Sequence, residues 1–281
     1  YPFHFKDRIS ILFKGNVDVT NGQFEVTFML PKDIQYNYGT GKIYYYALDT
    51  IHHTEGLGHF EDFFIGGSDP NAQFEDKGPD VDIYLNTLHF VSGGQVDERP
   101  LFIAYIDDPN GINTSGSGIG HDLQLTVDNN NEQTWNLNEA FVSTNGSFRS
   151  GSIHYRMSAL EEGKHSLRFR AWDLLNNSTT KELDFEVVKG LAPKVYQLIT
   201  YPNPAKSGEV IHFVFDHDRP SSVLETTLNI FDVSGRKIYS TTQQGGEHFT
   251  FIPNKASIGA GIYLYQFQIK TAESEITTQK S

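Results

Sequence analysis

Short apolar runs with a period of two residues are the feature that most constrains the fold of this chain. Because successive side chains of a strand point to opposite faces of a sheet, such alternation predicts half-buried β-strands. Turn signals recur about every ten residues between the runs, a spacing typical of sandwiches. The sequence therefore predicts an all-β protein of tandem Ig-like β-sandwich modules. The runs of the central region are Val81, Ile83 and Leu85; Leu101, Ile103 and Tyr105; Leu123, Leu125 and Val127; Leu167, Phe169 and Ala171; and Leu183, Phe185 and Val187.

Two clusters of proline and glycine divide the 281 residues into three parts. The breaks are Asp76-Lys-Gly-Pro79 and Lys189-Gly-Leu-Ala-Pro193. Such clusters end regular structure, because proline lacks a backbone donor and glycine adopts turn conformations. We expect a β module at residues 1–77, an Ig-like sandwich at 78–192 and a second Ig-like module at 193–281.

The two outer modules carry the same signals in shorter form. In the first, Asn21-Gly22 predicts a tight hairpin turn, and strands are expected at residues 24–28, 43–47 and 63–65. In the last, strands are expected around residues 211–215, 228–230 and 263–267. Both flanking modules therefore extend the all-β prediction.

Composition excludes several classes of function. The chain contains no cysteine, so it has neither a disulfide nor a thiol nucleophile of its own. Its net charge of −13 argues against nucleic acid, which is bound by basic surfaces. No apolar run approaches the roughly 18 residues needed to cross a bilayer. The chain starts at Tyr1 without a signal sequence, and we expect a processed product or a fragment.

Asp107-Asp108-Pro-Asn110-Gly111 is the one candidate metal site of the central module. Calcium prefers oxygen ligands, which Asp107, Asp108 and Asn110 could supply. The alternate spacing of an EF-hand loop is absent, and an Asx turn explains the same residues. No other cofactor is expected.

Two further groups in the first module are ambiguous. His52, His53 and His59 with Asp62 have ligand chemistry for zinc, but their spacing fits no closed site, and a polar glycine-containing loop explains them as well. Consecutive tyrosines at positions 44–46 place aromatic rings on both faces of one strand, which hints at contact with another module.

Three ordered motifs mark the last module. They are Tyr201-Pro202-Asn203-Pro204, Asp232-Val-Ser-Gly235 and Gly261-Ile-Tyr263. In this order they resemble the C-terminal sorting domain of type IX secretion cargo, proteins exported across the outer membrane of Bacteroidetes. The resemblance implies that the last module is an address label and that the protein works at the cell surface. Sorting domains usually end in a basic and apolar strand, whereas residues 276–281 stop early, so we expect a truncated final strand.

The earlier modules resemble the region that follows the peptidase domain in the PorU-type sortase of type IX secretion. The matching stretches lie at residues 22–34, 41–47, 111–122 and 163–178. That family has a gingipain-like cysteine peptidase domain with a Cys/His pair, which removes sorting domains from cargo and transfers the cargo to a lipopolysaccharide anchor. Because this chain has no cysteine, the resemblance implies a non-catalytic C-terminal region and no catalytic residue within it.

The expected role is to dock or localise the parent enzyme at the outer membrane. The resemblance implies two kinds of partner: an outer-membrane β-barrel or shuttle protein of the secretion system, and cargo sorting domains held by the parent enzyme. Two alternatives stay open, an exported adhesin or sugar-binding array and the tail of another exported hydrolase. The residues expected to bind a partner are Tyr201, Pro202, Asn203, Pro204, Asp232, Gly235, Gly261 and Tyr263.

Overall fold

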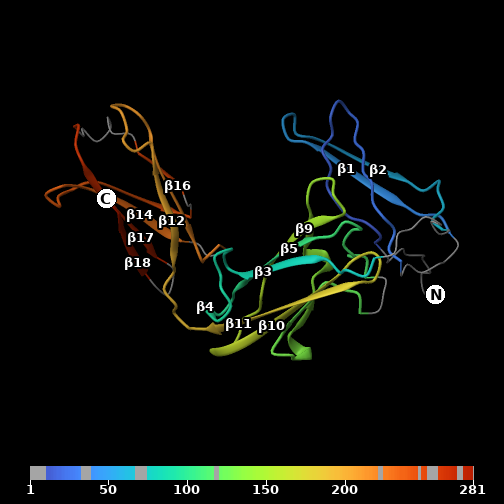
Figure 1. Ribbon diagram of the computed structural model, residues 1–281. Coiled ribbons are helices and arrows are strands. Elements are labelled where there is room, and N and C mark those ends of the chain that lie inside the picture. The colour runs from blue at the N-terminus through green and yellow to red at the C-terminus, as the bar shows by residue number, and fades with distance from the viewer. Residues whose placement is uncertain are drawn as a thin grey trace, which may run out of the picture.

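The computed structural model consists of β-strands and connecting loops, with two short 3-10 helices (Figure 1). It describes residues 11–32, 39–66, 75–116, 120–220, 224–245, 248–251, 259–270 and 275–280. The all-β prediction with tandem Ig-like sandwiches is confirmed by the central and last modules. The boundaries at 77/78 and 192/193 remain predictions.

The central module is a sandwich of two sheets. One sheet has the order β3-β5-β9-β8, and the other has the order β4-β11-β10-β6-β7. All pairings are antiparallel except that of β4 with β11. The elements are β3 (Asp80–Leu85), β4 (Gly94–Val96), β5 (Leu101–Asp107), β6 (Gln124–Val127), η1 (Asn131–Gln133), β7 (Thr134–Asn136), η2 (Asn138–Ala140), β8 (Phe141–Ser143), β9 (Ser150–Arg156), β10 (Gly163–Trp172) and β11 (Ser178–Val187).

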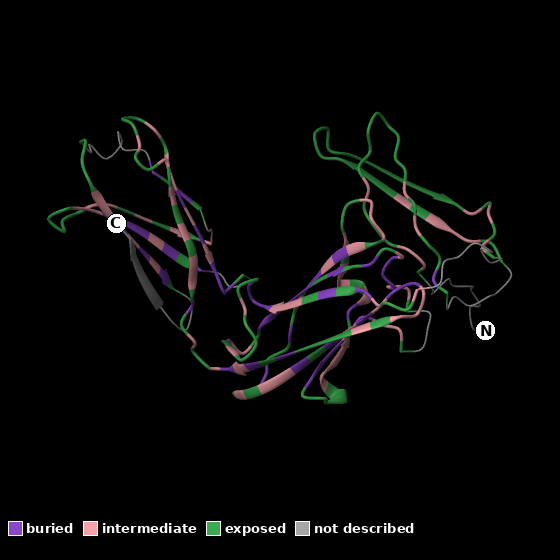
Figure 2. Ribbon diagram, viewed as in Figure 1, coloured by how far each residue is buried: buried purple, intermediate pink, exposed green. Residues whose placement is uncertain are grey.

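The core of this sandwich lies between the two sheets (Figure 2). In β10 and β11 the alternating residues chosen from the sequence do face this core. In β5 the alternation was assigned to the wrong face, because Phe102, Ala104 and Ile106 enter the core while Tyr105 is 42% exposed. The reason is that β5 is a continuous apolar run in the interior of its sheet, where periodicity does not distinguish the two faces.

The last module is a smaller sandwich. Its sheets have the orders β12-β13-β16 and β15-β14-β17-β18, and all their pairings are antiparallel. Aromatic rings fill its core, with Phe215 and Phe267 centroids 5.2 Å apart. The chain does supply a final strand, since β18 pairs with β17 along its whole length. The strands are β12 (Val195–Tyr201), β13 (Ile211–His217), β14 (Glu225–Asp232), β15 (Lys237–Gln244), β16 (His248–Phe251), β17 (Tyr263–Lys270) and β18 (Glu275–Lys280).

The first region differs from the sandwich that the sequence suggests. Within the described residues its regular structure is a two-stranded ribbon, β1 (Ile43–Asp49) with β2 (Thr54–Phe60). The Asn21-Gly22 turn forms as predicted, with positive φ at both residues. The strand expected at residues 24–28 is absent, and that at 63–65 is reduced to one bridge between Thr40 and Phe64. Alternation alone does not form a strand there, because no neighbouring sheet pairs with these segments.

The ribbon and the last module lie at opposite ends of the central sandwich (Figure 1). The last module contacts the central one through polar side chains. Arg219 is 4% exposed, and its guanidinium donates to the Leu191 carbonyl at 2.8 Å and pairs with Asp218 at 2.9 Å. Its Nε lies 4.0 Å from a carboxylate oxygen of Asp97 in the central module. A buried arginine therefore joins the last module, the linker and the central sandwich.

Candidate functional site

Tyr201 opens the first motif of the last module at the end of β12. It is 48% exposed, and its ring stacks on His212 with centroids 4.9 Å apart. Pro202 and Pro204 follow outside the strand, each after a cis peptide bond, and Asn203 lies between them. Because β12 lies at the edge of the sheet β12-β13-β16, the motif leaves an edge strand, a position that tolerates proline since proline has no backbone donor.

Asp232 holds the second motif together as a turn between β14 and β15. Its Oδ1 accepts hydrogen bonds from the Ser234 hydroxyl at 2.6 Å and from the Ser234 and Arg236 amides at 3.0 Å. Its Oδ2 accepts from Arg236 Nε at 3.0 Å. The Ser234 hydroxyl, assisted by these other donors, lowers the pKa of Asp232 below its ordinary value. Gly235 completes the turn with a φ of +84°.

Tyr263 begins β17 and ends the third motif. Its hydroxyl donates to the Gly259 carbonyl at 2.9 Å, which fixes the loop containing Gly261. Tyr263 is also the register partner of Asp232, so the second and third motifs meet at one end of their sheet. Within the third motif, Ile262 is 74% exposed.

The first motif lies at the same end of the module. A chain of neighbours connects it to the second motif across the two sheets. In the first sheet, Tyr201 pairs with His212, and the next residue of β13, Ile211, pairs with Phe251. The Phe251 ring lies 4.7 Å from the ring of Tyr239 in the second sheet, and Tyr239 pairs with Ile230, two residues before Asp232. Arg219 and the linker lie at the other end of β13. The structure therefore gathers the three motifs at the end farthest from the central module (Figure 1).

The residues of the calcium candidate diverge. Asp108 is buried, and its carboxylate accepts from the Asn110 and Gly111 amides at 2.7 and 3.1 Å, as an Asx turn would. Burial raises the pKa of Asp108 to about 6, with smaller contributions from Asp173 and Glu75. The Asn110 side chain donates to Glu75. Asp107 is exposed and does not join them.

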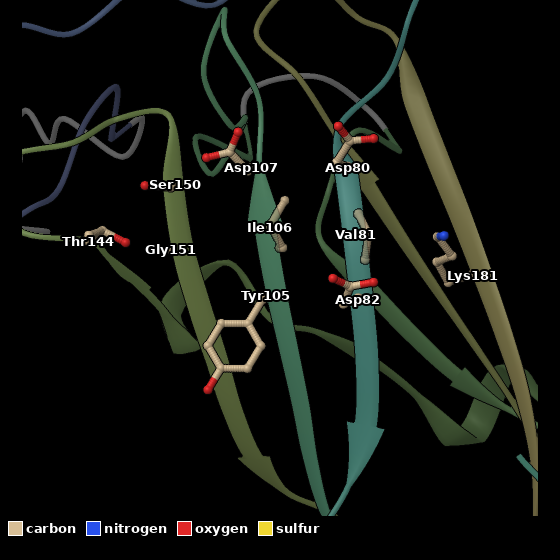
Figure 3. Close-up of a pocket in the computed structure, with 10 residues that line it drawn as sticks. All are labelled: Asp80, Val81, Asp82, Tyr105, Ile106, Asp107, Thr144, Ser150, Gly151 and Lys181. Atoms are coloured by element: carbon tan, nitrogen blue, oxygen red, sulfur yellow. The ribbon is translucent and has the colours of Figure 1, made fainter. Parts of the chain in front are cut away.

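Asp107 instead lines an open groove of about 440 Å³ on the outer face of β3, β5 and β9 (Figure 3). It is the register partner of Asp80, whose carboxylate pairs with Lys77 at 2.9 Å. Two facing carboxylates on neighbouring strands repel each other, and Lys77 offsets this repulsion. The calcium hypothesis for Asp107, Asp108 and Asn110 stays a prediction, in which an exposed carboxylate, that of Asp107, would have to act together with the buried one of Asp108.

The histidines of the first module do not form a cluster. His52 Nδ1 is 2.7 Å from Asp49 Oδ2, in a local contact across the ribbon turn. Across the described ranges, no group of three or more His, Asp or Glu side chains could hold a metal ion. The tyrosines at 44–46 line an open hollow of about 320 Å³ together with Leu57, Gly58 and His59.

Sequence reasoning missed Arg219 and the pair formed by His212 and His248. The two imidazoles lie on neighbouring strands, with Nδ1 of His212 2.9 Å from Nε2 of His248. Residues 216–220, Asp-His-Asp-Arg-Pro, form a charged run directly after an apolar strand, and that run could have indicated a polar joint. No local signal predicts the histidine pair, because its members are 36 positions apart.

No helix in the described part of the chain has the length and apolar character required to span a membrane. The chain has no match among curated proteins. Among solved structures it is similar to dimeric latent PorU from Porphyromonas gingivalis, with 32% identity, 93% of this chain covered and a TM-score of 0.45. The chain spans 25% of the length of that protein. The Ig1-2 module of Drosophila receptor protein tyrosine phosphatase DLAR is 8% identical, with 72% of this chain and 95% of that chain covered and a TM-score of 0.28.

The last module also matches a protein family. Residues 199–280 match the secretion system C-terminal sorting domain, a range that contains all three motifs. The resemblance to a type IX sorting domain is thereby confirmed, and a domain of this kind implies export to the cell surface. This chain ends in a member of the secretion system C-terminal sorting domain family, joined to modules that are similar to part of PorU.

Proposed function

We propose that this chain is the non-catalytic C-terminal β region of a cell-surface cysteine peptidase and sortase of the type IX secretion system. Its role is to dock or localise the parent enzyme at the outer membrane, where that enzyme removes C-terminal signals from cargo and attaches the cargo to the surface. The observation on which this rests is the sorting-domain family match of residues 199–280. The sequence similarity of the preceding modules to PorU supports the choice of parent enzyme.

The placement of the motifs supports a docking role for the last module. Tyr201, the Asp232 turn and the loop before Tyr263 occupy the end that faces away from the central sandwich. The opposite end is occupied by Arg219 and its contacts. Within the described part of the chain, the motif end lies away from the central sandwich, where a partner protein, either an outer-membrane β-barrel or a shuttle protein, can reach it (Figure 1). The exposed Ile262 there offers the apolar contact that a protein interface requires.

The chain contributes no thiol to the chemistry, because it contains no cysteine. The proposal therefore assigns the Cys/His pair to the peptidase domain of the parent. The purified chain should neither cleave nor transfer a sorting-domain substrate. Cleavage that persists through repurification and resists serine-protease and metalloprotease inhibitors would contradict the non-catalytic assignment.

The docking role is tested by removing residues 195–281 from the full-length parent and following surface display and cargo processing. We expect the shortened parent to be absent from the surface and cargo to keep its C-terminal signals. A matched control replaces residues 43–60 of the ribbon with a short glycine-serine linker, which leaves the last module intact and should preserve display. Normal display and processing after deletion of 195–281 would show that this module is not an address label here.

A finer test keeps the module folded. Two substitutions each introduce a charge at the motif end without touching the core. They are Ile262→Asp, before β17, and Val233→Asp, in the turn between β14 and β15, and both side chains are 74% exposed. We expect surface display to be lost with Ile262→Asp. If display is normal with both variants, the partner does not use this end of the module.

A further inference from the structure

The outer face of the sheet β12-β13-β16 carries two imidazoles that point at each other. His212 lies in β13 and His248 in β16, and these strands are directly paired. Their nearest ring nitrogens are 2.9 Å apart, and the rings are within 14° of parallel. His248 is exposed and His212 is partly exposed, so the pair lies on the surface and is not needed to fill the core.

We propose that His212 and His248 form a surface site for a borderline divalent transition-metal ion, with zinc as the natural probe. In a hydrogen bond between two neutral imidazoles, one ring nitrogen carries the proton and the other offers a lone pair. When a metal ion enters between them, the donor ring carries its proton on its other nitrogen, so both rings stay neutral and both facing nitrogens offer lone pairs to the ion. Two nitrogens bound to one tetrahedral zinc at 2.0–2.1 Å are about 3.3 Å apart. The distance between the two nitrogens therefore needs to increase by only a few tenths of an ångström, and the two rings need to turn so that both lone pairs point at the ion.

The surroundings hold the two ligands in place. Both side chains leave a regular antiparallel ladder, which fixes the separation of their backbones. The ring of Tyr201 stacks on His212 at 4.9 Å and restricts its rotation. On the other strand, the Gln243 side chain donates to the His248 carbonyl at 3.1 Å and steadies that residue.

The ligand set selects the metal. Imidazole nitrogen suits Zn²⁺, Cu²⁺ and Ni²⁺, whereas Ca²⁺ and Mg²⁺ require oxygen ligands. Two histidines fill half of a tetrahedral shell and leave two positions for water or for a side chain of another molecule. Because Tyr201 of the first motif contacts His212, a metal ion at this site would lie beside the motif end of the module.

The experiment is isothermal titration of the purified whole chain with zinc chloride, on the original chain and on His212→Gln and His248→Gln. We expect each variant to lose one binding event or to bind at that site about tenfold more weakly or worse. His154→Gln is the matched control, since His154 is an exposed strand histidine whose ring contacts Tyr105. It should titrate like the original chain.

Two further measurements separate this site from other histidines and from misfolding. Magnesium chloride should give no heat at this site. Zinc should raise the melting temperature of the last module in the original chain, and not in the two variants, whose melting temperatures without zinc should match the original. The inference is overturned if His248→Gln binds zinc with unchanged affinity and stoichiometry, or if the original chain binds no zinc at 1 mM. Neither result bears on whether residues 195–281 direct surface display.

Discussion

The ribbon and the last module flank the same central sandwich, yet they are stabilised in different ways. In the last module, two sheets enclose a core of ten buried residues, six of them aromatic. In the ribbon, every residue of β2 is exposed, and Leu57 reaches 83% exposure. Both regions form paired strands, and the last module adds a second sheet. The difference teaches that strand pairing alone leaves a ribbon exposed, whereas a stable sandwich requires a second sheet to cover its apolar face.

The largest test of this comparison removes one phenylalanine from each region. Phe267 is fully buried at the centre of the last module, where its ring contacts Phe213, Phe215 and Phe249. We expect Phe267→Ala to lower the free energy of unfolding of that module by about 3–5 kcal/mol, through lost burial and a residual cavity. Chemical denaturation followed by tyrosine fluorescence and circular dichroism measures the change.

The matched change in the ribbon is Phe60→Ala. Phe60 is 47% exposed and stacks on Phe63 at 5.7 Å. It should shift the unfolding of the last module by nothing measurable. An equal effect of both substitutions would mean that the two regions unfold as one unit and would remove the distinction drawn between them.

The second prediction concerns the joint between the last module and the central sandwich. Arg219→Gln removes the cation that pairs with Asp218 and the guanidinium that donates to the Leu191 carbonyl. We expect the contact between the two modules to be weakened by about 1.5–3 kcal/mol, the usual contribution of hydrogen bonds to charged groups, so that the joint opens more often. Limited proteolysis should then cut faster between residues 188 and 194.

The control for the joint is Arg236→Gln, because Arg236 is 78% exposed and forms an ion pair only within its own turn. It should leave proteolysis of the linker unchanged. Equal cutting in the original chain and in Arg219→Gln would show that the arginine does not hold the modules together.

The third prediction uses pH to compare the central module with the last one. Burial raises the pKa of Asp108 to about 6, above the ordinary 3.8, so the folded state binds this proton more tightly than the unfolded state. Acidification through the window from about pH 6 to pH 4 should therefore stabilise the central module. The lowered pKa of Asp232 has the opposite sign, and the last module should lose stability as the pH falls below 3.8.

Asp108→Asn and Asp232→Asn separate the two contributions. The asparagine oxygen at position 108 can still accept the two turn amides, so we expect the variant to fold and to lose the gain in stability between pH 6 and pH 4. In Asp232→Asn, the stability of the last module should no longer fall as the pH drops below 3.8. Melting curves recorded across pH 3 to 8 measure both, and unchanged profiles in the variants would refute the assignment to these carboxyls.

Much of the fold follows from the sequence because it rests on local signals. The alternation in β10 and β11, the core residues of β13 and β14 and the Asn21-Gly22 turn could all be predicted. The face of β5 could not, because both of its faces are apolar and only the neighbouring strands decide which one meets the core. The absence of strands at 24–28 also depends on tertiary pairing, which propensity does not encode.

The candidate site shows the same division. The motif residues Tyr201, Asp232 and Tyr263 were recognisable in the sequence, and their turns follow from local chemistry. Their gathering at one end depends on the pairing of β14 with β17 and on packing between the two sheets. The contacts of Arg219 and the approach of His212 to His248 join residues far apart in the chain, so no local pattern announces them.

The smallest predicted effect concerns the exposed face of the ribbon. Leu57→Ser should change the free energy of unfolding by less than about 0.5 kcal/mol, because the side chain is already 83% exposed and leaves no cavity. Tyr46, its register partner, is 61% exposed and donates its hydroxyl to Glu55 at 2.9 Å, so the ribbon pairing survives the change. Hydrogen exchange of the β1 and β2 amides measures whether the ribbon pairing is retained. Strong loss of protection in Leu57→Ser would mean that this leucine is packed in solution, and the contrast between a bare ribbon and a cored sandwich would then be wrong.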